Sequence, residues 1–200
     1  MKTFYVCSFG GCGSTLLANS LKRYGRVEHI HSRRPPIELE YIGNNNGGDT
    51  YYEWFNGIKV PEDELNDICV LFIYRNPIKA IYSRYIPYYE DCHKRHMDHV
   101  QIDRNVELKD VLSQKNDLFG ITEFYNNYTT RNEKRNYKIH CIKYEELFEK
   151  QDELSHLLEI GPLQLHKKET MKNYSHYNTL AEIYKNLIDD MNNRSFIETV

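Results

Sequence analysis

The sequence predicts an α/β protein of three layers (α/β/α), in which helices cover both faces of a central, mostly parallel sheet. Short apolar runs alternate along the chain with segments of helical periodicity. Two strand-to-helix junctions are sharp, one at the glycines of 10–13 and one at Arg75-Asn76-Pro77. The chain has 200 residues, of which 40% are hydrophobic and 13% aromatic. That is enough for one well-buried core and too little for two, so we expect 1–200 to form a single domain.

The first junction begins with the apolar run 3–7, which is β-branched and aromatic, as in a buried strand. Three glycines within the next six residues end this strand. Leu17, Leu21 and Tyr24 then recur at helical spacing, and a glycine follows them. We therefore expect a strand at 3–7, a glycine-rich loop, and a helix from 14 to about 24.

The glycine loop suits a phosphate or another anion. Glycines let backbone N–H groups approach an anion closely, and the start of a helix favours negative charge. The candidate anion-binding residues are Gly10, Gly11, Cys12, Gly13, Ser14 and Thr15. ATP-hydrolysing loops of this kind carry a lysine before the last hydroxyl residue, and this loop has none, which argues against ATP chemistry. For the loop alone, a tight turn without a ligand is the alternative.

The next elements alternate in the same way. Residues 27–31 form a plausible second strand, with His29 and His31 on one face. The irregular segment 32–57 is rich in aromatic residues, so we interpret it as an ordered excursion over the sheet rather than a linker. Residues 68–74 are almost continuously apolar, as in a central parallel strand.

The second junction follows this central strand and carries an arginine. Pro77 suits the first turn of a helix whose apolar stripe continues to residue 85. Ligands of parallel α/β sheets lie beyond the carboxyl ends of the strands, where both the glycine loop and Arg75 are expected. Ser83 is two turns into the helix, a spacing at which its hydroxyl and the Arg75 guanidinium can share one phosphate. The alternative is an ordinary ion pair between Arg75 and a carboxylate.

The rest of the chain continues the pattern. We expect a helix at 121–130, a strand at 137–143, helical turns at 145–150 and 154–159, and a strongly periodic last helix at 179–192.

Four segments, in this order, resemble the family of sulfotransferases that use PAPS (3′-phosphoadenosine 5′-phosphosulfate) as the sulfuryl donor. The glycine loop is similar to the loop that binds the 5′-phosphosulfate in that family. Tyr74-Arg75-Asn76-Pro77 through Ser83 and Tyr85 resembles its 3′-phosphate motif, in which an arginine and a serine eight residues later bind that phosphate.

The other two segments lie nearer the end of the chain. Ile142-Lys143-Tyr144-Glu145-Glu146-Leu147 resembles the Tyr-Glu-Asp/Glu-Leu segment that follows the fourth strand of the family. Lys167-Lys168, ahead of Asn173-Tyr174-Ser175, is loosely similar to the basic loop that closes over the nucleotide.

The resemblance implies a P-loop-like nucleotide-binding fold and sulfuryl transfer from PAPS to a hydroxyl or amine of a small-molecule or glycan acceptor. The product is adenosine 3′,5′-bisphosphate, and no metal is required. The family lysine of the loop aligns here with Gly11 or Cys12. Backbone amides, Ser14 and Thr15 can take over its role. A cation from elsewhere is the other possibility, with Arg33, Arg34, Lys59 and Lys167 as candidates.

Such a transfer needs a base that accepts the proton of the acceptor. We favour His31, at the carboxyl end of the second strand, because histidine titrates nearest neutrality. Lys59, in Lys59-Val60-Pro61, occupies a place similar to that of the family histidine and needs a pKa lowered by burial. The further candidates are His29, Asp49 and Glu53. The alternative for His31 is a partly buried strand histidine bonded to a carbonyl.

Two other classes of function compete with this one. The first is a non-catalytic nucleotide-binding or interaction protein that has the fold without the lysine. The second is a small kinase-like phosphotransferase, which the missing lysine disfavours.

Composition limits the partners. A net charge of −3 and a pI near 6.3 argue against a general nucleic-acid binder. No apolar run approaches 18 residues and five cysteines are irregularly spaced, so we expect a soluble cytoplasmic protein with reduced thiols and no membrane partner. His93, His96 and His99 recur every third residue, which favours a solvated polar face over a metal site.

Overall fold

The computed structural model describes residues 1–42, 57–84, 97, 102–167 and 174–200. Its sheet has five strands in the order β2-β1-β3-β4-β5. The strands are β1 (Thr3–Cys7), β2 (Arg26–Ile30), β3 (Ile68–Tyr74), β4 (Ile139–Lys143) and β5 (Ile197–Thr199). The first four are parallel, and β5 runs antiparallel to β4. The prediction of an α/β protein with a mostly parallel central sheet is therefore confirmed.

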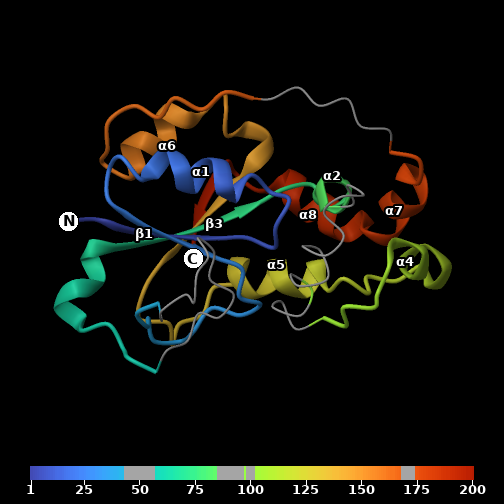
Figure 1. Cartoon of the computed structure of the whole chain (residues 1–200), viewed down its shortest axis with the longest axis horizontal. Coiled ribbons are helices and arrows are strands. Elements are labelled where there is room, and N and C mark those ends of the chain that lie inside the picture. Colours follow the sequence, from blue (N-terminus) through green and yellow to red (C-terminus); the bar gives the residue numbers. More distant parts are fainter. Residues whose placement is uncertain (43–56, 85–96, 98–101, 168–173) are drawn as a thin grey trace.

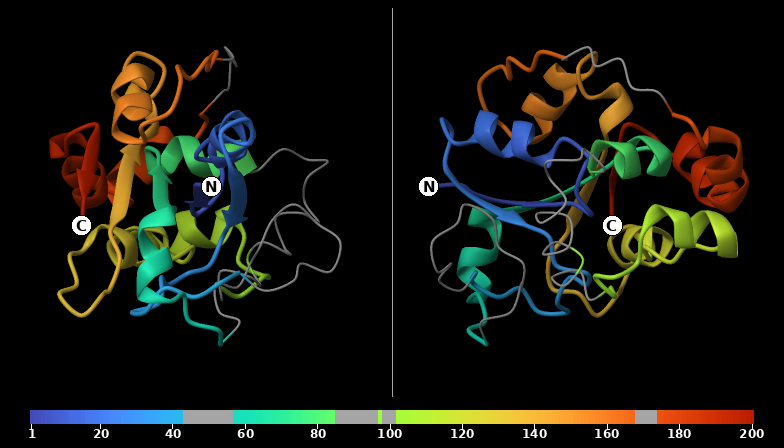
Figure 2. Two further views of the ribbon diagram at one scale, coloured as in Figure 1. Left: turned by 90° about the vertical axis from the view of Figure 1, so that its left-hand side faces the viewer. Right: turned by 45° about the vertical axis from the view of Figure 1, so that its right-hand side comes forward.

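Helices flank this sheet. The α-helices are α1 (Ser14–Leu21), α2 (Pro77–Arg84), α4 (Leu108–Gln114), α5 (Ile121–Thr129), α6 (Gln151–Leu157), α7 (Tyr177–Ile183) and α8 (Lys185–Asn193). Two 3₁₀ helices are η1 (Glu62–Asp67) and η3 (Tyr144–Glu146). α1 and α6 cover one face of the sheet and α5 lies on the other, while α2, α4 and α7 lie beyond the carboxyl ends of the parallel strands (Figures 1 and 2).

The two faces follow from alternation along the strands. In β1, Phe4 and Val6 pack with the apolar side chains of α1 and α6. The alternate residues, Tyr5 and Cys7, belong to the core on the opposite face of the sheet, which includes the aromatic side chains of α5. Because successive strand residues point to opposite faces, one short apolar run is buried on both sides.

β3 is the central strand, with β1 on one side and β4 on the other. Phe72 pairs in register with Cys7 of β1 and with Cys141 of β4. Its ring stacks on that of Tyr128 in α5, with centroids 4.5 Å apart. This register brings the segments that follow the three strands to one edge of the sheet.

Several element boundaries differ from the predictions. The strands at 3–7 and 68–74 are confirmed as predicted, and the first helix ends at Leu21. The predicted last helix is two helices that meet at Tyr184, whose φ of −98° and ψ of 15° interrupt the helical conformation. Tyr184 is buried, and its hydroxyl donates to Oδ1 of Asp117 at 2.8 Å. Most of the predicted excursion, 43–56, lies outside the described residues.

Three elements have no counterpart among the predictions: η1, α4 and β5. α4 has only seven residues and begins with a reciprocal capping box between Glu107 and Asp110. β5 has only three residues, too few for an alternation pattern, and it forms by pairing with the edge of β4.

A hydrogen bond joins α5 to α8 and gives a stability prediction. The Tyr125 hydroxyl donates to Oδ2 of Asp190 at 2.7 Å. Tyr125→Phe leaves the packing in place and removes this one hydrogen bond to a half-exposed acceptor, so the free energy of unfolding should fall by about 1 kcal/mol. Urea denaturation measures the change. No loss of stability in this variant would contradict a structural role for the bond.

None of the helices in the described residues is long and apolar enough to cross a bilayer.

Candidate functional site

The strand order creates a switch point between β1 and β3. The chain leaves β1 through α1 on one face of the sheet, and it leaves β3 towards α5 on the other. In open parallel sheets a crevice forms outside the carboxyl ends of two such strands, and ligands bind there. The glycine loop and Arg75 follow these two strands directly.

The glycine loop turns sharply into α1. Gly10, Gly11 and Gly13 all have positive φ, of 105°, 69° and 86°. The first helical backbone bond runs from Leu17 N–H to the Gly13 carbonyl at 3.1 Å, and no side chain caps the helix. The N–H groups of the first turn are therefore not used by a capping side chain, and they carry the positive end of the helix dipole.

Tyr144, the first residue after β4, closes on this loop. A Cβ on Gly13 would lie 2.3 Å from Cε2 of Tyr144, well inside contact distance. The side of the ring therefore lies where any larger residue at position 13 would place its side chain. The segments that follow β1 and β4 therefore lie against each other, across the end of β3, which is between the two strands.

Arg75 lies between the glycine loop and Tyr144. Its Nη1 donates to the carbonyl of Gly11 at 3.3 Å, and its guanidinium carbon is 4.5 Å from the centre of the Tyr144 ring. Within the described part of the chain, Arg75 has no carboxylate partner, and its buried Nε has no hydrogen-bond acceptor. The alternative of an ordinary ion pair is therefore not seen for Arg75 in these residues.

Asn76 and Glu145 fix the start of α2, and the sequence analysis assigned neither a role. The side-chain oxygen of Asn76 accepts from the N–H groups of Ile78 and Lys79, at 3.0 and 3.3 Å. The Asn76 N–H donates to Oε1 of Glu145 at 3.0 Å. Asparagine followed by proline is a helix-start signal, so the sequence contained the information for this cap.

Of the two residues predicted to bind the 3′-phosphate, Arg75 precedes α2 and Ser83 lies within it. Ser83 is half-buried and makes no hydrogen bond to a described residue. Next to it, the Tyr82 hydroxyl accepts from the His176 N–H at 3.0 Å, and its ring meets that of Tyr174 edge to face at 5.1 Å. The segment after 173 therefore docks on α2. Lys167 is exposed, and Lys168 lies outside the described residues.

Beneath the loop lies a chain of four buried polar side chains. Nδ1 of His31 donates to the Ser8 carbonyl at 2.7 Å, and the Ser8 hydroxyl donates to Ser14 Oγ at 2.8 Å. The Ser14 hydroxyl also forms a hydrogen bond with Nε2 of His29 at 2.8 Å. Burial, with a smaller contribution from Lys22, lowers the pKa of His29 to about 4.

These hydrogen bonds change which hydroxyl of the loop is available to an anion. Ser14 is buried, and its hydroxyl is engaged within the protein, whereas Thr15 is exposed. Of the two predicted hydroxyl ligands, Thr15 is the one at the surface. His31 contacts the loop through Ser8, because its Nδ1 bonds to the Ser8 carbonyl. This is the arrangement that the sequence analysis gave as the alternative to a catalytic base.

Lys59 belongs to a different part of the molecule. It is exposed, and its side chain pairs with Glu38. Its backbone forms an isolated antiparallel β-bridge with Glu40, just before η1, which leads into the amino end of β3. Among the described residues it has no hydrogen bond or ion pair with the glycine loop. The structure therefore does not bring Lys59 to the site. Asp49 and Glu53 lie outside the described residues.

Arg33 and Arg34, two of the candidate replacement cations, share one carboxylate. Both guanidinium groups bond to Glu123 of α5, and these bonds lower the pKa of that carboxyl to about 2. Both guanidinium groups are therefore held at α5, and Glu123 offsets one of their two charges. A hollow of about 650 Å³ lies beside this cluster, and Asp103, Val106 and Thr122 also line it.

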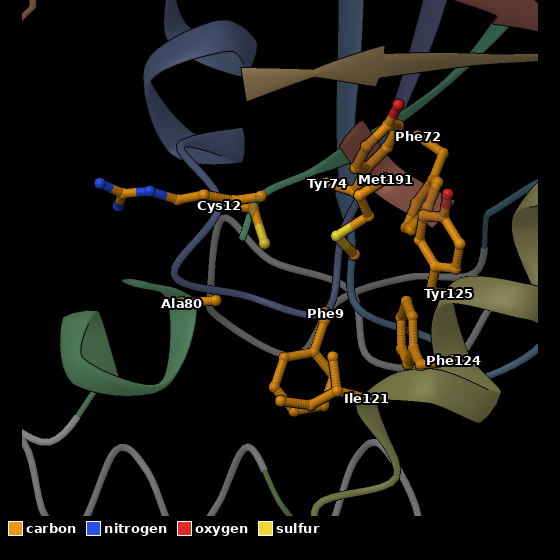
Figure 3. Close-up of a pocket in the computed structure, with 10 residues that line it drawn as sticks. Phe9, Cys12, Phe72, Tyr74, Ala80, Ile121, Phe124, Tyr125 and Met191 are labelled. Carbon is orange, nitrogen blue, oxygen red and sulfur yellow. The ribbon is translucent and has the colours of Figure 1, made fainter. Parts of the chain in front are cut away.

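A smaller cavity, of about 10 Å³, lies under the loop. Phe9 and Cys12 of the loop, Tyr74 of β3, Phe124 of α5 and Met191 of α8 surround it (Figure 3). The hydroxyl of Tyr74 is buried without a hydrogen-bond partner among the described residues. A space of this size suits a single water molecule rather than a substrate.

No cluster of three metal-ligating side chains occurs in the described ranges, and His93, His96 and His99 lie outside them. A scan against models of protein families, a search of curated proteins and a search of solved structures found no match to this chain.

Proposed function

We propose that the chain binds PAPS at the β1/β3 switch point and transfers its sulfuryl group to a hydroxyl or amine acceptor. One observation carries the proposal. The glycine loop after β1 and the arginine after β3, both expected from the family motifs, meet at Gly11 and Arg75, and Tyr144 from the third motif packs on both. The fold proposed on this basis is the P-loop-like sulfotransferase fold.

The residues present fit an anionic nucleotide. The loop supplies backbone N–H groups at a helix start, and Arg75 is a half-buried cation without a carboxylate partner in the described residues. Ser83 offers a hydroxyl for a second phosphate, and Lys167 and Lys168 offer charge from the segment that leads to Tyr174. When bound, PAPS would supply the activated sulfuryl group.

The acceptor side of the proposal involves His31. Its Nδ1 proton is held by the Ser8 carbonyl, so the basic lone pair of the neutral imidazole is on Nε2. The mixed-charge hollow beside Arg33 and Glu123 suits a polar small molecule or glycan. Its lining includes Arg33, which follows His31 by two residues in the segment after β2.

A second candidate function is a non-catalytic binder of PAPS or its product. It is favoured by the absence of lysine and arginine from 8–15 and by the engagement of His31 with the backbone. Both functions share the nucleotide site and differ only in whether a group is transferred.

Calorimetry with adenosine 3′,5′-bisphosphate and with ATP tests the nucleotide site. The bisphosphate should bind, and ATP should bind at least ten times more weakly, because the loop lacks the lysine that reaches the outer phosphates. Tight binding of ATP, without binding of the bisphosphate, would reject the sulfotransferase proposal in favour of a phosphotransferase.

Transfer of label from [³⁵S]PAPS to phenols, amines, sugars and glycans then separates the enzyme from the binder. His31→Gln provides the matched variant. Transfer that falls in this variant, while bisphosphate affinity is kept, supports His31 as the base. A wild-type chain that binds the bisphosphate and labels no acceptor class is a binder.

A further inference from the structure

We propose that Arg75, at the end of β3, supplies the positive charge that the glycine loop does not itself contain. The inference rests on the proposed function, because it concerns the phosphate that the loop would hold. It assigns Arg75 to that phosphate, rather than to the 3′-phosphate for which the sequence motif nominates it.

The loop needs charge from outside its own sequence. Residues 8–15 contain no lysine or arginine, so the loop offers an anion only backbone amides and hydroxyls. Of the replacement cations considered from the sequence, Arg33 and Arg34 are both bonded to Glu123 of α5, and Lys59 is paired with Glu38. Lys167 is exposed at the end of a described range.

Arg75 is positioned against the loop itself. Its only hydrogen bond to a described residue is the 3.3 Å bond to the carbonyl of Gly11, one of the two positions with which the family lysine aligns. Of the five N–H groups of the guanidinium, one bonds to Gly11 and the Nε–H is buried, so three Nη N–H groups have no acceptor in the described chain and can bond to an anion.

Tyr144 holds the guanidinium in this place. The ring lies 4.5 Å from the guanidinium carbon, a distance at which cation and aromatic face attract each other. The same ring blocks the space beside Gly13. Arg75 therefore lies between an aromatic face and the loop, and its charge is not neutralised by a described carboxylate.

The two assignments of Arg75 predict different ligand series. If Arg75 serves the loop, Arg75→Ala weakens every ligand that places a phosphate there, and pyrophosphate, adenosine 5′-phosphate and adenosine 3′,5′-bisphosphate lose affinity by the same factor. If Arg75 serves the 3′-phosphate, only the bisphosphate loses affinity. Loss of one charge-assisted bond is expected to weaken binding by about 10- to 100-fold.

The experiment is calorimetric titration of the full chain with these three ligands. The variants are Arg75→Ala, Arg75→Lys and the control Arg131→Ala, which removes an exposed arginine paired with Glu133. Thermal unfolding without ligand checks that each variant folds. We expect equal losses for all three ligands in Arg75→Ala, partial recovery in Arg75→Lys, and wild-type affinities in Arg131→Ala.

The outcomes separate this inference from the proposed function. Loss of the bisphosphate alone in Arg75→Ala overturns the role at the loop and leaves the PAPS proposal standing. If the wild-type chain binds pyrophosphate in an Arg75-dependent way but not the bisphosphate, the role at the loop stands and the PAPS proposal fails. Unchanged affinities in Arg75→Ala, or no binding of any ligand by the wild-type chain, overturn the role of Arg75.

Discussion

Gly13→Ala should lower the free energy of unfolding by about 3 kcal/mol, and with it the affinity of the loop for phosphate ligands. Two costs combine at this position. The φ of 86° is a left-handed conformation, which costs an alanine about 1–2 kcal/mol. The added Cβ would also lie 2.3 Å from the Tyr144 ring, and overpacking of this kind costs about 1–3 kcal/mol.

Gly57 provides a matched control. Its φ of 78° is similar, but a Cβ there would meet nothing within 4 Å. Gly57→Ala should therefore lose only about 1 kcal/mol, the backbone cost alone. Chemical denaturation of both variants, and of Gly13→Ala in a Tyr144→Ala background, isolates the contact. Equal losses for Gly13→Ala and Gly57→Ala would show that the Tyr144 ring yields without cost.

The second large effect is a loss of stability in mild acid, caused by His29. The pKa of His29 is lowered to about 4 in the folded protein, chiefly because burial disfavours the charged imidazole, whereas an unfolded histidine titrates near 6.5. Below about pH 6.5 the unfolded chain therefore takes up a proton at this position that the folded chain does not. Stability is complete above pH 6.5 and falls progressively down to about pH 4, by on the order of 3 kcal/mol.

Urea denaturation at intervals from pH 7 to pH 4.5 measures this loss. His29→Gln should show a flatter dependence, because its amide oxygen can still accept the Ser14 hydroxyl but does not titrate. His140→Gln is the comparison, since burial also lowers the pKa of His140, at a half-exposed position. Parallel pH curves for the wild type and His29→Gln would mean that His29 is not held neutral.

A residue pattern predicts structure well where it has one physical solution. An almost continuous apolar run such as 68–74 can be buried on both faces only inside a sheet, and β3 is the central strand. A pattern predicts structure poorly where it shows which face of a helix is apolar but not where the backbone leaves the helical conformation. The apolar stripe of 179–192 continues through Tyr184, so periodicity alone cannot reveal that α7 and α8 are separate there.

The candidate site shows the same division. The positions of the glycine loop, Arg75 and Tyr144 follow from their places after parallel strands, so the sequence predicts that they lie at one edge of the sheet. The partners of individual side chains depend on atomic packing. Nothing in the sequence distinguishes Ser14, whose hydroxyl is engaged by Ser8 and His29, from the neighbouring exposed Thr15. Lys59 was assigned to the site from a motif of three residues, but in the structure it pairs with Glu38, away from the glycine loop.

The register of β1, β3 and β4 determines how the site would respond to motion within the folded protein. Gly11, Arg75 and Tyr144 are far apart in the chain and meet only while all three strands stay paired. Any opening that separates one strand dismantles the site, so a bound anion should suppress the opening of β1, β3 and β4 together. In hydrogen exchange, ligand would therefore slow the amides of these three strands by a common factor.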